Sequence, residues 1–287
     1  MNQNFKNESF EKENLENEAL EIQMLLEAIH QKYGYNFKDY AKAHTKRRLR
    51  HRLNVSHLNN YAEMMHKVIH DEDYFNSLLL DLSINVTEMF RDPGVYKKIR
   101  QDLIPRLKTY SFIKVWHAGC SAGQEVYSMS ILLEEEGMKD RSQLYATDFN
   151  ELILEKAKMG IYPLEVMKTY TGNYQKSGGK KDFSDYYAAD YDNVILRQSL
   201  KKKVLFSSHN LVTDGVFGEM NLIFCRNVLI YFNRQLQNRV LKLFYDSLCP
   251  GGYLCLGSKE NLKFTDVEDQ FETIADREKI YRKKRLP

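Results

Sequence analysis

The first 84 residues carry the spacing of apolar positions that is typical of amphipathic helices. In residues 19–33 (ALEIQMLLEAIHQKY) and 60–84 (NYAEMMHKVIHDEDYFNSLLLDLSI), apolar side chains recur every three or four positions. Up to about Ile84 this helical periodicity is the only pattern that we find. We therefore predict a small helical domain over residues 1–84.

The pattern changes after Pro105, where short runs rich in β-branched and aromatic residues begin to alternate with amphipathic stretches. The amphipathic stretches predict helices at Glu125 to Glu135, Glu151 to Met159 and Arg234 to Leu248, the last one ended by a turn at CPGG (249–252). Strands that alternate with helices favour an α/β fold with a mostly parallel sheet covered on both faces. The strands are expected at 112–119, 143–148, 203–209, 221–227, 253–258 and 279–283.

One segment, residues 175–202, interrupts this alternation. Its sequence (QKSGGKKDFSDYYAADYDNVILRQSLKK) contains a glycine-lysine loop, clustered tyrosines and a turn at Asp192-Asn193. We interpret it as an insertion that forms a small β-hairpin outside the main sheet.

Composition narrows the class of protein. The 287 residues suffice for two modest domains, and 43% hydrophobic residues with a net charge of +3 describe a soluble globular protein rather than a nucleic-acid binder. The four cysteines form no CxxC pair, which is typical of a reducing compartment. No apolar run approaches the ~18 residues of a membrane span, so we expect a cytoplasmic protein without membrane insertion.

The charge is unevenly distributed in the N-terminal region. Acidic residues dominate residues 2–27, whereas residues 42–53 (KAHTKRRLRHRL) contain six Lys and Arg and no acid. A solvated surface helix would explain this stripe without any function. We favour electrostatic docking of an acidic protein partner through Lys42, Lys46, Arg47 and Arg50, because a stripe without acidic partners repels itself. Nucleic acid is disfavoured, because aromatic residues are not interleaved with the basic ones.

The predicted strands deliver polar residues to one edge of the sheet, where open α/β folds bind ligands. Gly119 and Gly123 follow the first strand and would let a ligand approach the backbone, and Glu125 begins the next helix. Asp148 ends the second strand, at about the distance expected of a carboxylate that binds ribose hydroxyls. Further residues follow later strands: Asn210, suited to an adenine edge, and Asn227 and Tyr231, near the expected reacting centre.

Two acids and two amides without a phosphate-binding residue fit a nucleoside that carries a cation. S-adenosylmethionine is such a ligand, whereas NAD would require a GxGxxG turn for its pyrophosphate, and that spacing is missing. Each signal alone has an ordinary explanation as a tight turn or a helix cap. Their occurrence in strand order favours an S-adenosylmethionine site.

Five motifs, in order and spacing, resemble the chemotaxis receptor methyltransferases, the CheR family, over nearly the whole chain. The motifs are NVTEMFRDP (85–93), AGCSAGQEVYS (118–128), ATDFNELILEKAKMGIY (146–162), HNL (209–211) and CRNVLIYF (225–232). The resemblance implies a Rossmann-like class I methyltransferase domain over residues 85–287, behind a substrate-docking helical domain over residues 1–84. It also implies methyl transfer from S-adenosylmethionine to glutamate side chains on the cytoplasmic helices of chemoreceptors.

The resemblance assigns roles to individual residues. It implies that Arg91 and Tyr231 lie beside the transferred methyl group. It implies cofactor contacts at Asn85, Thr87, Arg91, Glu125, Asp148, Asn210, Leu211, Asn227 and Val228. No metal is implied.

This chain departs from the family at two places. Ala122, Gln124 and Val126 stand where the family commonly has Thr, Glu and Pro, although Glu125 is kept. The insertion falls where the family carries a small β-subdomain that in some members binds a pentapeptide at the receptor's C-terminus. The segment here does not align with that subdomain, so a receptor C-terminal peptide remains an open partner.

The chemistry of such a reaction explains why no Ser-His-Asp or Cys-His arrangement stands out. A glutamate with a pKa near 4.3 is already ionised at neutral pH and needs no general base. Positioning of the carboxylate then supplies the catalysis, and we expect Arg91 and Tyr231 to give one or two directional hydrogen bonds. Two alternatives stay open: a cofactor-binding sensor or scaffold, and a methyltransferase with a non-receptor protein substrate. A monomer is expected.

Overall fold

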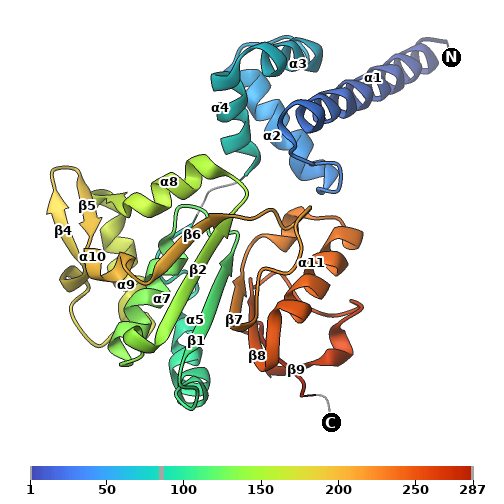
Figure 1. Cartoon of the computed structure of the whole chain (residues 1–287). Coiled ribbons are helices and arrows are strands. Elements are labelled where there is room, and N and C mark those ends of the chain that lie inside the picture. The colour runs from blue at the N-terminus through green and yellow to red at the C-terminus, as the bar shows by residue number, and fades with distance from the viewer. Residues whose placement is uncertain (1, 84–86, 286–287) are drawn as a thin grey trace. The chain divides into compact units, whose positions relative to one another are not determined.

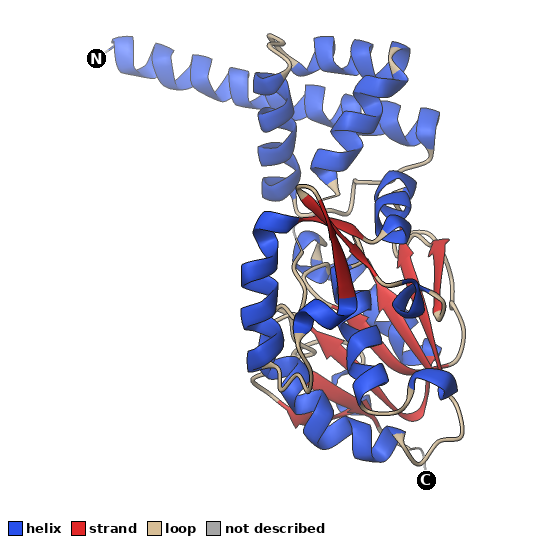
Figure 2. Cartoon of the chain, turned by 90° about the vertical axis from the view of Figure 1, so that its left-hand side faces the viewer, coloured by secondary structure: helices blue, strands red, loops and turns tan. Residues whose placement is uncertain are grey.

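A computed structural model of the chain describes residues 2–83 and 87–285 and divides the chain into two compact units. The first unit comprises Met1–Ile84 together with Tyr231–Asn233, and the second comprises Asn85–Ile230 and Arg234–Pro287. Helices make up the regular structure described in Met1–Ile84, whereas every strand that the structure describes belongs to the second unit (Figures 1 and 2).

Two helices of the first unit, α3 (Tyr61–His70) and α4 (Glu72–Leu82), begin where the sequence supplies a capping side chain. Asn60 accepts a hydrogen bond from the backbone N–H of Glu63 at 2.9 Å, and the Glu63 carboxylate accepts the backbone N–H of Asn59 at 3.0 Å. Asp71 caps the following helix by accepting the N–H of Tyr74 at 3.0 Å. The helices before them are α1 (Asn2–Tyr33) and α2 (Lys42–Val55).

The core of the first unit follows the predicted periodicity. Leu25 and Ile29 on α1 and Met64 and Val68 on α3 are fully buried, and each pair is spaced by four residues. Leu49 on α2 is fully buried as well. The predicted helical character of the N-terminal domain is confirmed.

The second unit contains a seven-stranded sheet with the order β6-β2-β1-β7-β8-β10-β9 (Figure 1). The first five strands in this order are parallel, and β10 and β9 are antiparallel to their neighbours. The strands are β1 (Ile113–Ala118), β2 (Ser142–Asp148), β6 (Val204–Ser208), β7 (Met220–Cys225), β8 (Leu248–Leu256), β9 (Phe271–Ala275) and β10 (Ile280–Lys283). The mostly parallel α/β sheet predicted from the sequence is confirmed.

The helical segments of the second unit are α5 (Pro93–Lys98), the π-helical η1 (Ile99–Leu103), α6 (Ile104–Leu107), α7 (Gln124–Glu135), α8 (Glu151–Met159), α9 (Met167–Lys176), α10 (Gln198–Lys201) and α11 (Arg234–Ser247). The three predicted helices, α7, α8 and α11, lie close to their predicted bounds, whereas α5, η1, α6, α9 and α10 were not predicted. Short 3-10 turns are η2 (Lys139–Arg141), η3 (Leu164–Val166), η4 (Phe183–Tyr186), η5 (Leu229–Tyr231) and η6 (Glu268–Gln270). The CPGG segment ends α11, but it lies inside β8 rather than in a turn, with a register shift against β7.

The insertion forms a separate three-stranded antiparallel sheet with the order β3-β5-β4. The hairpin of β4 (Tyr187–Asp190) and β5 (Asn193–Leu196) stands out from the main sheet beside α9 and α10 (Figure 1). The third strand, β3 (Ile161–Pro163), lies outside the predicted bounds of 175–202. A strand of three residues is too short for an alternating pattern to reveal it.

The inserted segment is attached to α7 through a buried carboxylate. The Glu135 side chain is 0% exposed and accepts hydrogen bonds from the Tyr186 hydroxyl and the Lys180 backbone N–H, both at 2.9 Å. It also accepts from the Tyr174 hydroxyl and pairs with the Arg100 guanidinium. Burial opposes ionisation, but these donors lower the pKa of Glu135 below its usual value.

Replacement of this carboxylate should destabilise the second unit. Glu135→Gln removes one of the two carboxylates that pair with the buried Arg100, the other being Glu136, and we expect a loss of about 2 kcal/mol in the free energy of unfolding. Glu134→Gln is the matched control, because Glu134 pairs with Lys139 at the surface and should contribute less than about 1 kcal/mol. Denaturant unfolding measures both variants, and equal losses would contradict the anchoring role.

Candidate functional site

The order of the strands puts a topological switch point between β1 and β7, and we call the space beyond the carboxyl ends of these two strands the crevice. On one side of this point the sheet continues to β2 and β6, and on the other side it continues to β8, so the connections run in opposite directions. At such a switch point the loops after the two strands separate and leave room for a ligand beyond their carboxyl ends. The loops in question are residues 119–123 after β1 and residues 226–231 after β7.

The two glycines of the first loop serve different contacts. A Cβ atom on Gly119, which has φ +76°, would lie 2.7 Å from Cγ2 of Val228, so the loop after β7 approaches here because Gly119 has no side chain. Gly123, with φ +87°, would bring a Cβ atom to 3.1 Å from Ala157 on α8. The turn therefore brings Gly119 and Val228, two of the expected cofactor contacts, against each other.

Asp148 lies at the carboxyl end of β2 beside this turn. Its carboxylate accepts the backbone N–H of Ser121 at 3.0 Å and that of Asn150 at 3.1 Å. The residue is 7% exposed, and burial raises the pKa of Asp148 to about 6 although these backbone donors favour its ionised form. Such a carboxyl group can accept further donors, such as the hydroxyls of a ribose.

Glu125 on α7 is held from both sides. His117, a fully buried residue of β1, faces Oε1 of Glu125 with its Nδ1 at 2.9 Å, and Nη1 of Arg226 lies 3.2 Å from Oε2. Burial opposes ionisation of Glu125, but these two partners outweigh it and lower its pKa. The ring of His117 stacks on Phe224 with centroids 4.6 Å apart, which fixes the imidazole. Glu125 is therefore a fixed negative charge at the start of α7.

Arg226 connects Glu125 to the segment before α5. Its Nη2 lies 2.6 Å from the Asp92 carboxylate, and its Nη1 donates to the backbone carbonyl of Arg91 at 3.3 Å. The same segment is bound to α7, because the N–H of Phe90 donates to the Ser128 hydroxyl at 2.8 Å. The structure thus brings the backbone around Arg91 and the Glu125 carboxylate to one guanidinium.

The loop after β7 is fixed by a carboxylate that the sequence did not single out. The backbone N–H groups of Asn227, Val228 and Ile230 all donate to Glu260, at 3.0, 2.9 and 3.3 Å. Glu260 is 4% exposed and follows β8. We missed Glu260, Arg226 and His117 as site residues. One sequence signal was available, because Arg226 lies inside the recognised CRNVLIYF motif.

Asn210 and Leu211 lie in the turn after β6. The side-chain oxygen of Asn210 accepts the N–H of Val212 at 3.0 Å, and its own backbone N–H donates to Asp214 at 2.9 Å. Because the amide oxygen already accepts this hydrogen bond, the amide nitrogen is the better placed group for a ligand. Leu211 is 8% exposed.

For four of the expected site residues the structure gives less detail. Asn85 lies outside the described residues, and Thr87 is half-buried in the extended segment before α5. Arg91 belongs to the second unit, whereas Tyr231 groups with the first. The expectation that Arg91 and Tyr231 flank one methyl group stays a prediction.

The basic residues expected to dock a partner all lie on α2, and one premise about them was wrong. Lys46 and Arg50 do have an acidic partner, because both pair with Glu18 on α1, at 2.7 and 2.8 Å. The hydrogen bond from Lys46, followed by that from Arg50, lowers the pKa of Glu18. Lys42 and Arg47 are exposed and form no ion pair among the side chains that the structure describes. The stripe is therefore partly neutralised within the unit.

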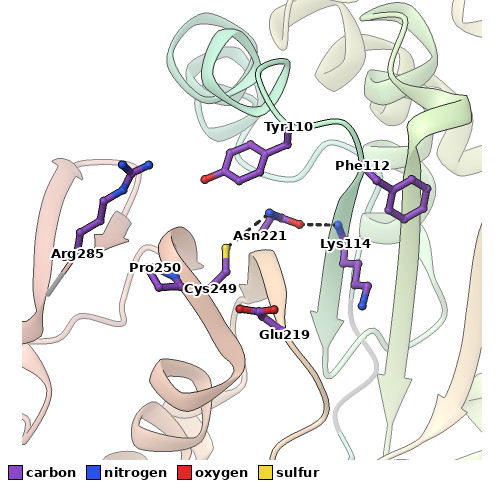
Figure 3. Close-up of a pocket in the computed structure, with 8 residues that line it drawn as sticks. All are labelled: Tyr110, Phe112, Lys114, Glu219, Asn221, Cys249, Pro250 and Arg285. Carbon is purple, nitrogen blue, oxygen red and sulfur yellow. Dashed lines mark hydrogen bonds between the residues drawn. The ribbon is translucent and has the colours of Figure 1, made fainter.

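A cavity of about 690 Å³ lies at the opposite end of the strands from the crevice (Figure 3). It sits at the amino ends of β1, β7 and β8, where the Asn221 side chain accepts the N–H of Lys114 at 2.8 Å. Its lining residues are Tyr110, Phe112, Lys114, Glu219, Asn221, Cys249, Pro250 and Arg285. Because the carboxyl ends of the parallel strands lie at the other edge, this cavity is distinct from the crevice between β1 and β7.

The described residues, 2–83 and 87–285, contain neither a metal-binding cluster nor a helix suited to span a membrane. No cluster of three or more His, Cys, Asp or Glu side chains in that part of the chain is arranged to hold a metal ion. None of the helices described there is both long enough and apolar enough to cross a membrane.

Comparison with known proteins identifies the family. Residues 85–280 match the family model described as CheR methyltransferase, SAM binding domain, and residues 20–83 match the model described as CheR methyltransferase, all-alpha domain. A Pseudomonas putida protein provisionally named methyltransferase Cher3 is 48% identical over 263 residues, which cover 92% of this chain and 96% of the relative.

Two relatives are named chemotaxis protein methyltransferase. The Vibrio anguillarum protein is 34% identical over 201 residues, covering 67% of this chain and 70% of the relative. The Salmonella typhimurium protein is 30% identical over 253 residues, covering 86% of this chain and 85% of the relative. The chain therefore belongs to the CheR methyltransferase family, and its cofactor is S-adenosylmethionine.

Proposed function

We propose that this protein transfers a methyl group from S-adenosylmethionine to glutamate side chains on the cytoplasmic helices of a chemoreceptor. The observation that carries the proposal is the switch point between β1 and β7, with Glu125 following β1 and Asp148 ending the neighbouring strand β2, in a chain of the CheR family. The products would be a glutamate methyl ester and S-adenosylhomocysteine, and the reaction would serve adaptation in chemotaxis in the cytoplasm.

The residues of the crevice fit this cofactor. Asp148 is a buried carboxyl group that accepts the backbone N–H groups of Ser121 and Asn150, and its oxygens retain capacity to accept two ribose hydroxyls. Glu125 carries a fixed negative charge that complements a ligand with an ammonium group and a sulfonium. Gly119 has no side chain, so Val228 of the loop after β7 can lie directly against the turn that follows β1.

In this reaction the protein positions the methyl group and the substrate carboxylate, and no proton has to be transferred. The cofactor supplies an electrophilic methyl carbon on sulfur, so that a substrate carboxylate forms the C–O bond while the C–S bond breaks and its electron pair stays on sulfur. The substrate carboxylate is ionised at neutral pH. Arg91 would orient it with a directional hydrogen bond, because a tight ion pair would stabilise the ground state whose charge is lost in the transition state.

The first test is methyl transfer itself. Labelled S-adenosylmethionine and a purified chemoreceptor cytoplasmic fragment should give label on glutamate that mild base releases, as an ester requires. Arg91→Ala should lower kcat about a hundredfold while the affinity for cofactor changes little, because misplacement of a reacting group costs about that factor. Absence of label with intact cofactor binding would contradict the receptor substrate, and equal losses of kcat and affinity would contradict the orienting role.

Cofactor binding should weaken in acid because of Asp148. Burial raises its pKa to about 6, so the carboxyl group of the cofactor-free protein takes up a proton as the pH falls through that value. The ionised form accepts both ribose hydroxyls, so binding releases the proton. Affinity should therefore be constant above about pH 7 and fall up to tenfold per pH unit below about pH 6.

Titration calorimetry with S-adenosylhomocysteine between pH 5 and pH 8 measures this dependence. Asp148→Asn is the control, because it removes the titrating group and should bind more weakly at pH 8 with a flatter pH profile. If Asp148→Asn keeps the wild-type affinity at pH 8, or if its affinity still falls with pH as steeply as that of the wild type, Asp148 does not belong to the ribose site.

Docking through α2 should depend mainly on the residues that are not already paired. At physiological salt, Lys42→Ala with Arg47→Ala should raise KM for the receptor fragment about fivefold, which corresponds to about 1 kcal/mol. Lys46→Ala with Arg50→Ala is the matched double variant, and it should raise KM less than twofold, because these side chains are engaged by Glu18. Methylation that is insensitive to salt, or equal effects of the two double variants, would contradict this mode of docking.

A further inference from the structure

The loop after β7 lies outside the ladder of backbone hydrogen bonds that joins the strands of the main sheet. The last residue of β7 is Cys225, and α11 begins at Arg234. Buried backbone N–H groups outside a ladder must find other acceptors, because leaving one without a partner costs about 1–3 kcal/mol. Three such groups in this loop donate to the single carboxylate of Glu260.

The geometry spreads the donors over both oxygens of that carboxylate. Oε1 accepts the N–H of Val228 at 2.9 Å and of Ile230 at 3.3 Å, and Oε2 accepts the N–H of Asn227 at 3.0 Å and of Gly257 at 2.6 Å. Glu260 forms no ion pair with any Lys, Arg or His among residues 87–285, so these four peptide groups are what solvate a buried side chain.

The surrounding backbone is shaped to fit the carboxylate. A Cβ atom on Gly257 would lie 2.7 Å from both the backbone nitrogen of Asn227 and Oε2 of Glu260. Asn227 itself has φ +62°, a left-handed conformation that Asn adopts more readily than most other non-glycine residues. Glu260 accepts the backbone N–H of Asn227 at this residue, where the loop turns.

The same loop forms one wall of the crevice. Val228, held by Glu260, lies against Gly119, and Arg226, one residue before Asn227, carries the guanidinium that pairs with Glu125. A change in the loop backbone would therefore move three groups at once: the amide of Asn227, the side chain of Val228 and the partner of Glu125.

We propose that Glu260 is a positioning residue that sets the geometry of the cofactor site by holding the backbone of Asn227, Val228 and Ile230. It acts through this loop and not by contact with the reacting atoms. The inference rests on the proposed function only in placing the cofactor in the crevice between β1 and β7. A structural role alone would stabilise the fold and leave the affinity of the folded protein unchanged.

The test uses the full chain with Glu260→Gln, a replacement of nearly the same size that loses the charge and turns an amide NH₂ group toward backbone donors. We expect the affinity for S-adenosylhomocysteine to fall tenfold or more at a temperature where circular dichroism shows the variant folded. Glu260→Asp keeps the charge but is shorter by one methylene group, and its affinity should lie between those of Glu260→Gln and the unaltered protein.

Glu268→Gln is the matched control on the same segment. Glu268 is an exposed glutamate that accepts a single backbone N–H, from Phe264 at 2.6 Å, and its replacement should change the affinity less than twofold. Wild-type affinity in folded Glu260→Gln would overturn the proposal. Failure of the unaltered protein to bind S-adenosylhomocysteine would instead contradict the placement of the cofactor.

A second readout does not depend on any ligand. Hydrogen exchange in the cofactor-free protein should be at least tenfold faster at the amides of Asn227, Val228 and Ile230 in Glu260→Gln, while the amides of β7 keep their protection. Unchanged exchange at these three amides, or a uniform loss of protection over β7 and the loop, would overturn the local positioning role.

Discussion

A single buried cation joins the parts of the crevice. Arg226 comes directly after β7, yet its guanidinium reaches Glu125 on α7 and Asp92 ahead of α5. Its side chain is only 2% exposed, so the two carboxylates and the cation must stay together or be left uncompensated. The β1–α7 loop, the segment around Arg91 and the loop after β7 consequently cannot be rearranged independently of one another.

Two other carboxyl groups, at the crevice end of the sheet, are held by backbone N–H groups rather than by charged side chains. Asp148 and Glu260 are both buried carboxyl groups that accept backbone N–H donors, and no cation pairs with either among residues 87–285. Burial raises the pKa of each, whereas His117 and Arg226 lower the pKa of Glu125. Carboxyl groups at one end of the sheet thus differ in how readily they ionise, and the difference comes from their partners.

Local patterns were sufficient to predict six of the seven strands of the main sheet and the helices α7, α8 and α11. Helix α8 has the predicted bounds, because Asn150 caps its start and Gly160 takes a left-handed conformation at its end. Strand β9 was missed, because only Phe271 and Ala275 of its five residues are buried and the sequence between them does not alternate. The CPGG segment was assigned to a turn, since nothing local indicates that β8 continues through it beside β7.

The site was predictable only where its residues follow strands in order. Glu125 and Asp148 could be expected because parallel strands end at one edge of a sheet. Arg226 pairs with Glu125 across 101 positions, and Glu260 reaches Asn227 across 33, and pairings of this kind leave no periodic trace in a sequence. The same limit explains why the acidic partner of the basic residues on α2 was missed. Glu18 lies on another helix, 32 positions before Arg50.

The grouping of Tyr231–Asn233 with the first unit bears on how the chain can be divided. The polypeptide passes between the units after Ile84, and again on each side of this short segment. Within the first unit, the carbonyl of Tyr231 accepts the N–H of Ala41 and the N–H of Asn233 donates to the carbonyl of Asp39, both at 2.8 Å. A truncated protein starting at residue 85 would keep Tyr231–Asn233 but lose these partners. A division of the chain at residue 85 therefore does not follow the boundary between the two units.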